Sequence, residues 1–178
     1  MSTGRLSINL TKYFADRGYK VTLICTRSVA RSGLYYEAGL AKDPLVNTIQ
    51  IETTDQMLNA LEAEKYTKYD LIVHAAAVGD YKADFTFKME DMAKEILDLV
   101  SKDNFSNQTS QEAYKDILDI LTNPKCKVND DTKISSYEPN LTVKLGLTPK
   151  IIANLRNWFP NSKLVGFKLL ENVSKEHI

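Results

Sequence analysis

The sequence predicts an α/β protein of the doubly wound, Rossmann-like type, with a mainly parallel sheet, a polar and helical excursion, and a flap. Three observations lead to this prediction. Apolar residues recur at helical spacing near the start of the chain, and short strand patterns rich in β-branched residues then alternate with helices. In addition, segment 70–78, "DLIVHAAAV", is apolar on both of its alternating faces, which is typical of a strand in the middle of a parallel sheet.

The first helix and the two strands after it follow from local patterns. Leu6, Leu10, Tyr13 and Phe14 share helical spacing, and Gly18 is a natural helix end. The segments "KVTLICT" and "TIQIE" are then expected to be strands, with a polar segment between them.

The next helix is predicted from its first residues. Thr53 and Gln56 have the spacing of a capping box, and Met57, Ala60 and Leu61 form the inner stripe of the helix that this box begins. The buried strand 70–78 follows. This alternation of helices and strands implies right-handed crossovers.

Residues 82–132 interrupt the alternation and are interpreted as an excursion from the sheet, with helical patterns near 88–100 and 110–122. Regular structure returns with "NLTVKLGL". We then expect a helix with Thr148 as its cap and Pro149 in its first turn, followed by a buried strand over 163–170. The inward-facing residues of that helix are Ile151, Leu155, Trp158 and Phe159.

The composition favours one globular domain, 1–178. The chain has 178 residues, 43% of them apolar, and its 23 basic residues balance 23 acidic ones, so no general attraction to nucleic acid or to a membrane is expected. Cys25 and Cys126 have no metal-site spacing, and we expect a reducing, cytoplasmic location. Because a doubly wound sheet normally opens with a strand, we also expect this domain to lack its first strand and its C-terminal elements.

Ligands of open α/β sheets bind beyond the carboxyl ends of the strands, which directs attention to three segments. "STGRL" places Ser2, Thr3 and Gly4 at a helix start, as an anion site or simply as a cap. In "HAAAVGDY", small alanines leave room for a flat group, and Asp80 offers a carboxylate to a ribose or a metal. Alternatively, the alanines only pack under a helix and Asp80 caps a turn.

The remaining candidates have equally plain alternatives. His74 and Phe167 could be core residues. Lys133, on a polar, turn-rich tip, is either a solvated lysine or a flap residue that closes over a triphosphate and neutralises charge on phosphorus.

Seven motifs in this order resemble the phosphopantothenate-cysteine ligase family, in its stand-alone bacterial form: "STGRLS", "RGYKVTLI", "TTDQM", "HAAAVGDY", "KISS", "LTPKII" and "LVGFKLL". The resemblance implies a Rossmann-like homodimer. It also implies a ligase of coenzyme A biosynthesis that joins 4'-phosphopantothenate and L-cysteine through an acyl cytidylate made from CTP. Mg²⁺ is expected as well, because triphosphates usually carry it and it needs few protein ligands.

The resemblance also implies site residues. Nucleotide contacts fall on His74, Ala75, Ala76, Asp80, Thr148, Pro149 and Phe167, and phosphopantothenate contacts on Ser2, Thr3 and Gly4. The catalytic lysine of the family falls on Lys133. No protein metal ligand is implied.

The sequence departs from the family in several places. The catalytic asparagine that the family carries two residues before the position of Ser2 has no counterpart, and Gly79 replaces an alanine or serine. "KISS" leaves ATP open as an alternative to CTP. An NAD(P)-dependent short-chain-type reductase and an inactive nucleotide-binding module are the competing functions. The reductase is disfavoured because the glycine fingerprint and the Tyr-Lys pair of that class are missing.

Overall fold

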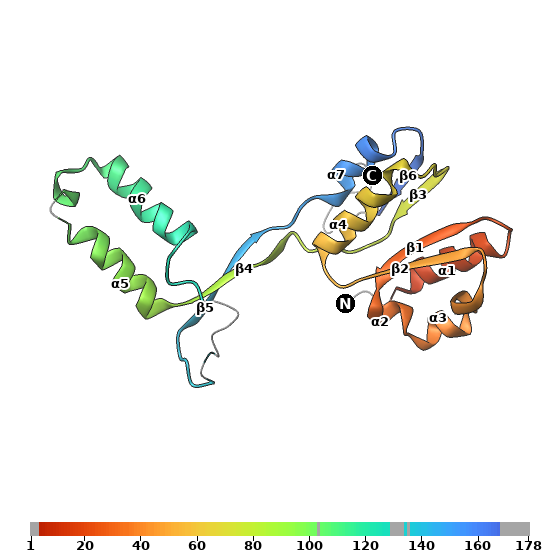
Figure 1. The fold of residues 1–178 in the computed structure, drawn as a ribbon, viewed down its shortest axis with the longest axis horizontal. Helices are drawn as coiled ribbons and strands as arrows, with labels where there is room; N and C mark the ends of the chain where they lie inside the picture. Colours follow the sequence, from red (N-terminus) through yellow and green to blue (C-terminus); the bar gives the residue numbers. More distant parts are fainter. Residues whose placement is uncertain (1–3, 103, 129–133, 135, 168–178) are drawn as a thin grey trace, which may run out of the picture. The chain divides into compact units, whose positions relative to one another are not determined.

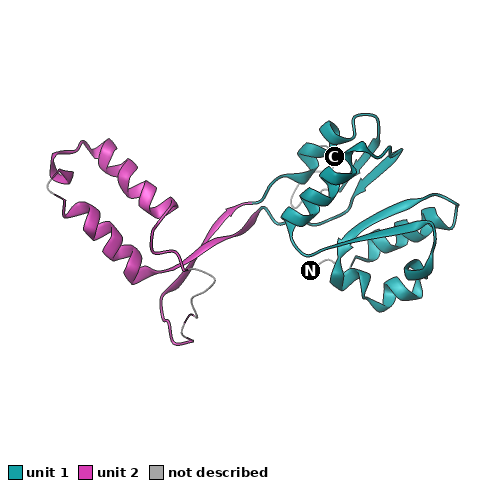
Figure 2. Cartoon of the chain, in the orientation of Figure 1, with its two compact units in different colours: residues 1–80, 148–178 teal, residues 81–147 magenta. Residues whose placement is uncertain are grey.

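The computed structural model describes residues 4–102, 104–128, 134 and 136–167, and these form two compact units. Unit 1 comprises residues 1–80 and 148–178, and unit 2 comprises 81–147 (Figure 2). The predicted excursion, 82–132, falls inside unit 2.

Unit 1 contains parallel strands and covering helices, as the α/β prediction required (Figure 1). Strands β1 and β2 pair in parallel from Val21↔Val46 to Thr26↔Ile51, and β3 pairs in parallel with β6 from Leu71↔Lys163 to His74↔Gly166. The strands are β1 Val21–Thr26, β2 Val46–Ile51, β3 Leu71–His74 and β6 Lys163–Gly166. The helices are α1 Arg5–Ala15, α2 Arg27–Ala30, α3 Gly33–Glu37, α4 Thr54–Ala63 and α7 Ile151–Trp158, with 3-10 turns η1 Leu40–Lys42 and η2 Glu64–Tyr66.

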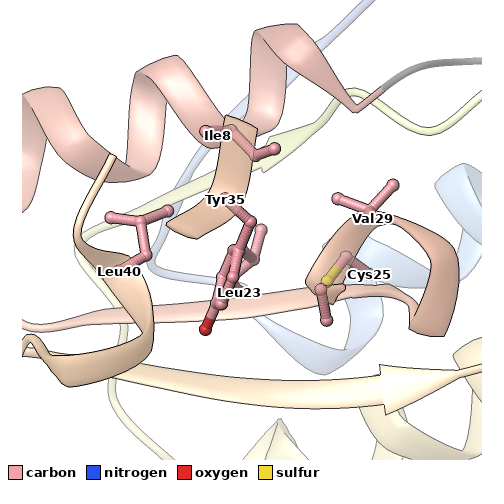
Figure 3. Packing of buried hydrophobic residues seen from close by; sticks show 7 residues of the cluster. Ile8, Leu23, Cys25, Val29, Tyr35 and Leu40 are labelled. Carbon is pink, nitrogen blue, oxygen red and sulfur yellow. The ribbon is translucent and has the colours of Figure 1, made fainter. Parts of the chain in front are cut away.

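The first core cluster packs α1, α2 and α3 against one face of β1 (Figure 3). Ile8 of α1 is fully buried, and Leu23 and Cys25 of β1 are nearly so. Burying one such aliphatic side chain contributes about 1.5–3 kcal/mol to stability. The cluster consists of Ile8, Leu23, Cys25, Val29, Ala30, Tyr35 and Leu40.

The second core cluster covers the opposite face of the strands with α4 and α7. It joins Ile51, Met57, Ile151, Leu155 and Phe159, and partly buried residues of β1, β3 and β6 pack against it. Because helices pack on both sides of the strands, unit 1 is doubly wound.

The predicted capping box at the start of α4 is confirmed. The Thr53 hydroxyl accepts a hydrogen bond from the Gln56 backbone amide at 3.1 Å, and the Gln56 side-chain carbonyl accepts from the Thr53 amide at 3.3 Å. The inward positions predicted for α7 are also confirmed, since Ile151, Leu155 and Phe159 are buried.

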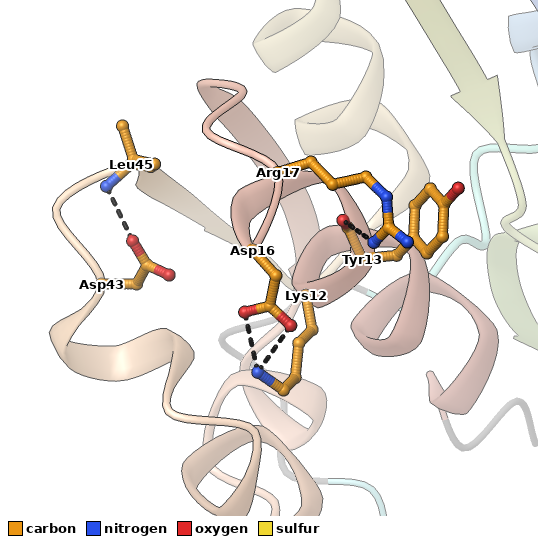
Figure 4. A network of polar contacts seen from close by, with 6 residues as sticks. All are labelled: Lys12, Tyr13, Asp16, Arg17, Asp43 and Leu45. Carbon is orange, nitrogen blue, oxygen red and sulfur yellow. Dashed lines mark hydrogen bonds and ion pairs between the residues drawn. The ribbon is translucent and has the colours of Figure 1, made fainter.

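The inner face of α1 differs from the prediction. Ile8, Thr11 and Ala15 are its buried residues, whereas Leu6 and Tyr13 are nearly half exposed. Tyr13 is instead covered by the guanidinium of Arg17, 3.5 Å from the ring centre (Figure 4).

Polar contacts close the end of α1 and the turn before β2 (Figure 4). Arg17 donates a hydrogen bond to the Tyr13 carbonyl at 3.0 Å, and Lys12 pairs with Asp16 at 2.9 Å. The Leu45 amide donates to Oδ1 of Asp43 at 2.9 Å. These exposed contacts are each worth at most about 1 kcal/mol, so they define the chain path more than they stabilise it.

Two strand predictions are wrong in extent. Strand β3 ends at His74, and its residues are only half buried, although a fully buried mid-sheet strand was expected. Strand β6 is described only to Gly166, and three of its four residues are exposed. The physical reason is the same for both. Within the described residues these two strands form a two-stranded sheet, so β3 and β6 each have one edge without a neighbouring strand.

Two short helices were missed. The segment between β1 and β2 was described from the sequence only as polar, and it forms α2, α3 and η1. Ser32 caps α3 by accepting from the Tyr35 amide at 3.2 Å.

Unit 2 is a hairpin that carries two helices. Strands β4 and β5 pair antiparallel, with an irregularity between Ala83 and Phe85. The helical patterns predicted near 88–100 and 110–122 coincide with α5 and α6. The elements are β4 Tyr81–Lys88, α5 Met89–Val100, η3 Phe105–Asn107, α6 Ser110–Thr122 and β5 Leu141–Leu147.

Candidate functional site

The candidate site lies at the carboxyl ends of the parallel strands of unit 1. Strand β1 ends at Thr26, β3 at His74 and β6 at Gly166, and the register places His74 beside Gly166. Ligands of open α/β sheets bind at such ends because loops and helix amino termini converge there.

The alanines after β3 line a cavity of about 1360 Å³ that also reaches the start of α1. Ala75 is half buried, and Ala76 and Ala77 are exposed. The same cavity is lined by His74 and Gly4. The structure therefore brings together residues predicted from two distant motifs, "STGRL" and "HAAAVGDY".

The start of α1 requires glycine at position 4. Gly4 is the residue before the helix, with φ 68° and ψ 4°, and its carbonyl accepts from the Ile8 amide and the Ser7 hydroxyl, both at 2.9 Å. A Cβ atom on Gly4 would lie 2.6 Å from both γ-carbons of Val29. Gly4 and Ser7, at the start of α1, line the cavity, and the first-turn amides of a helix favour an anion.

His74 is partly buried, and this burial lowers the pKa of its imidazole below the usual 6.5. The side chain is therefore neutral near pH 7. A neutral imidazole offers one donor and one acceptor to a ligand but no fixed positive charge.

A pair of hydroxyls at the end of β1 was not singled out from the sequence. Oγ1 of Thr26 and Oγ of Ser28 lie 2.9 Å apart, and Thr26 lines the cavity. The rule that sites lie beyond strand ends could have found them, because "KVTLICT" was correctly predicted as a strand.

Asp80 and Thr148 are adjacent through the backbone. The Thr148 amide donates to the Asp80 carbonyl at 2.9 Å, and Thr148 is buried whereas Asp80 is exposed. The prediction that Thr148 caps the following helix is wrong. Helix α7 begins at Ile151, and the residue before it, Lys150, makes no side-chain cap. Thr148 and Pro149 therefore lie before the first helical residue of α7, too far from its first turn for the Thr148 hydroxyl to act as the cap.

Phe167 directly follows Gly166 and is 56% exposed, so its side chain is not a core residue. Since Gly166 is the partner of His74, Phe167 belongs to the same end of the sheet as the alanines. A Cβ atom on Gly166 would lie 2.8 Å from Cδ1 of Ile152. This contact shows how tightly α7 packs behind the end of β6.

Ser2, Thr3 and Lys133 lie outside the described residues, so their assignments stay predictions. Within the described ranges, no group of three or more His, Cys, Asp or Glu side chains could hold a metal ion. Among those same residues, no helix has the length and apolar character needed to cross a bilayer.

Comparisons with known proteins agree with this fold. Residues 1–125 match the family described as the DNA/pantothenate metabolism flavoprotein C-terminal domain. The chain is 29% identical to the coenzyme A biosynthesis bifunctional protein CoaBC of Thermococcus kodakarensis, over 99% of this chain but 30% of that protein. It is also similar to the crystal structure of the DNA/pantothenate metabolism flavoprotein from Streptococcus pneumoniae, with a TM-score of 0.63 and 25% identity over 99% of this chain and 63% of that one.

Proposed function

Because the chain belongs to the DNA/pantothenate metabolism flavoprotein C-terminal domain family, we propose that it is the ligase that joins 4'-phosphopantothenate to L-cysteine. The family and its Rossmann-like fold agree with the motif resemblance, and the CoaBC relative acts in coenzyme A biosynthesis. The chain spans about 30% of that relative's length, so the reaction, its substrates and its cytoplasmic location are parts of this proposal.

The proposed reaction has two steps. A carboxylate oxygen of 4'-phosphopantothenate attacks the α-phosphorus of CTP, and the bond to pyrophosphate breaks. The amine of cysteine then attacks the acyl carbon, CMP leaves with the electrons of the broken acyl bond, and the amine loses a proton. Activation is needed because a free carboxylate is a poor acyl donor.

The observation that carries the proposal is that Gly4 and the alanines 75–77 line one cavity at the ends of the parallel strands. The α1 amino terminus can bind a phosphate there, and Ala75 and Ala76 allow a flat base or ribose to lie against the backbone. This arrangement would hold the two anionic substrates so that the carboxylate of one lies next to the α-phosphate of the other, as the first step requires.

Other residues receive proposed roles from the family pattern. We assign nucleotide contacts to His74, Asp80 and Phe167, and to the segment Thr148–Pro149. Lys133 would neutralise charge on the phosphates, and Ser2 and Thr3 would contact phosphopantothenate. Mg²⁺ is proposed to arrive on the triphosphate, because it needs few protein ligands.

The decisive experiment is pyrophosphate release with CTP, 4'-phosphopantothenate and cysteine. The proposal predicts release that requires all three substrates, and an ATP series tests nucleotide choice. Thermal stabilisation by CTP with Mg²⁺ but no turnover would indicate an inactive binding module. Stabilisation by NADPH instead would indicate the reductase.

Lys133→Ala tests the catalytic assignment. This substitution removes a positive charge that would stabilise the negative charge developing on the phosphates in the transition state. The rate of pyrophosphate release should therefore fall ~100-fold or more. Lys102→Ala, at an exposed lysine of unit 2, is the matched control and should leave the rate unchanged. A Lys133→Ala variant with full rate would remove the role assigned to this side chain.

We also propose a homodimer, with an apolar row on unit 2 as the contact. Leu141, Val143, Leu145 and Leu147 alternate along β5 and are 40–74% exposed. A contiguous exposed row of this kind marks a protein contact more often than a free surface. Sedimentation should therefore report twice the chain mass.

A further inference from the structure

Helices α5 and α6 of unit 2 contact each other and run in opposite directions (Figure 1). The backbone amides of Lys125 and Cys126, which follow α6, donate to the Glu95 carboxylate of α5 at 3.0 and 3.1 Å and hold the pair together. In each helix, buried or half-buried apolar residues recur every three or four positions, as a contact between two helices requires. This contact stripe consists of Met92, Ile96, Leu99, Ala113, Ile117 and Ile120.

A second apolar stripe lies one residue after the first in both helices, and it is exposed. Its large side chains are 41–66% exposed. One residue along a helix is a rotation of ~100° about its axis. Because the two helices are antiparallel, this rotation turns both second stripes to the same side of the pair. Together they form one surface, the apolar face, which consists of Ala93, Leu97, Val100, Tyr114, Leu118 and Leu121.

The opposite side of the pair is acidic. A carboxylate lies one residue before each member of the contact stripe, at Asp91, Glu95, Asp98, Glu112, Asp116 and Asp119. The connecting segments lie on this side, since Glu95 accepts from the segment after α6 and Asp116 accepts from Nε2 of Gln108 at 2.8 Å. Water and these segments therefore cover the acidic side, whereas the apolar face is open. A contiguous apolar surface of this kind marks a protein contact.

The position of the apolar face on each helix indicates what covers it. In a three-helix bundle the two neighbours of a helix lie ~60° apart around its axis, whereas in a four-helix bundle they lie ~90° apart. The contact stripe and the exposed stripe are ~100° apart in both α5 and α6. Each helix is therefore built to have a further helix directly below it. A single helix in the groove between them would leave Leu97 and Leu118 at its sides.

We infer that a second copy of this chain covers the apolar face, and that the two helix pairs form a four-helix bundle. The second copy offers two helices with the same stripes at the same spacing, so the contact is self-complementary. Charge does not oppose it. The acidic sides of the two copies point away from each other and lie ~20 Å apart, which is more than twice the Debye length of ~8 Å at physiological salt. This contact is additional to the one proposed for β5 and does not depend on ligase activity.

The size of the apolar face predicts a weak, reversible contact. Helix α5 has 12 residues and is ~18 Å long, and two adjacent helices are ~20 Å wide. The pairing then covers ~400 Å² on each copy, or ~800 Å² in all, whereas stable, specific contacts bury ~1200–2000 Å². The bundle should therefore form only at high protein concentration, and the contact at β5 would set the state at low concentration.

The test is sedimentation equilibrium of the Leu145→Lys chain from ~1 to ~500 μM, because this background removes the contact proposed for β5. We expect monomers at the lowest concentration and dimers at the highest. In the chain without substitutions, the same contact should appear as growth beyond twice the chain mass at high concentration. Amide hydrogen exchange should locate the contact, since the amides of α5 and α6 should exchange more slowly in the associated form.

Two neighbouring substitutions separate the two sides of the helix pair. Leu118→Lys places a charge on the apolar face and should raise the dissociation constant at least ~10-fold, whereas Asp119→Lys, on the acidic side, should change it less than ~2-fold. Leu97→Lys repeats the first test on α5, and a thermal melt matching that of the parent chain shows that each variant is folded. A single mass at all concentrations would overturn the inference, with the face then left to a different protein. Equal association of the Leu118→Lys and Asp119→Lys chains would overturn it as well.

Discussion

Replacing Gly4 by alanine tests the packing of α1 against α2, on which the cavity mouth depends. Gly4 has φ 68°, and an added Cβ would lie 2.6 Å from both γ-carbons of Val29, a side chain that is 8% exposed. The left-handed conformation costs an alanine about 1–2 kcal/mol, and forcing a methyl group into packed surroundings costs about 1–3 kcal/mol more. We therefore expect Gly4→Ala to lower the free energy of unfolding by about 2–5 kcal/mol.

The assay is urea unfolding at equilibrium, with Gly18→Ala as the matched control. Gly18 has φ 82°, but nothing lies within 4 Å of its Cβ position, so this variant should lose only the conformational part, about 1–2 kcal/mol. The difference between the two variants measures the contact with Val29. A second substitution, Val29→Ala, should recover part of the Gly4→Ala loss in a double-mutant cycle. Equal losses in the two glycine variants, with no coupling to Val29, would refute the steric reasoning.

Three further predictions concern a cap, a titrating group and a surface. Thr53→Ala removes one half of the α4 capping box and should lower the free energy of unfolding in urea by about 1 kcal/mol. No measurable change would show that the cap does not stabilise the chain. Burial lowers the pKa of His74, so the unfolded chain takes up its proton first as the pH falls. Stability from this group is complete above pH 6.5 and declines below it, by no more than about 1.4 kcal/mol per pH unit, until the folded pKa is reached. His74→Gln should remove this part of the decline below about pH 6.5, and an unchanged profile would contradict the assignment. Leu145→Lys should convert the proposed dimer to monomer in sedimentation, while Lys102→Ala should not, and a dimeric Leu145→Lys would move the contact elsewhere.

Local patterns predicted the elements that local interactions decide. The α4 capping box uses atoms within a few residues of each other, so Thr53 and Gln56 were enough to identify it. Strands β1 and β2 were predicted from their β-branched residues, and the helices of unit 2 from apolar spacing. The short helices α2 and α3 were missed, because a helix of four or five residues has too few positions to show a period.

Burial was predicted wrongly where it depends on residues that are distant in the sequence but close in space. Segment 70–78 has the composition of a central strand, yet β3 is half buried, since one of its edges borders a cavity. Thr148 shows the same limit. Its type and the following proline are those of a helix start, but α7 begins only at Ile151, and the Thr148 amide pairs with Asp80, which is distant in sequence.

The sequence by itself determined the α/β class, the family and the segments that carry candidate chemistry, because periodicity, capping and ordered motifs are properties of consecutive residues. Only the tertiary structure decided that Gly4 and the alanines after β3 line one cavity, that His74 lies beside Gly166, and that Leu10 and Phe14 line the same cavity. These facts depend on strand pairing and helix packing between residues far apart in the chain. Such pairing follows from the whole arrangement of edges and faces, which no short stretch of sequence specifies.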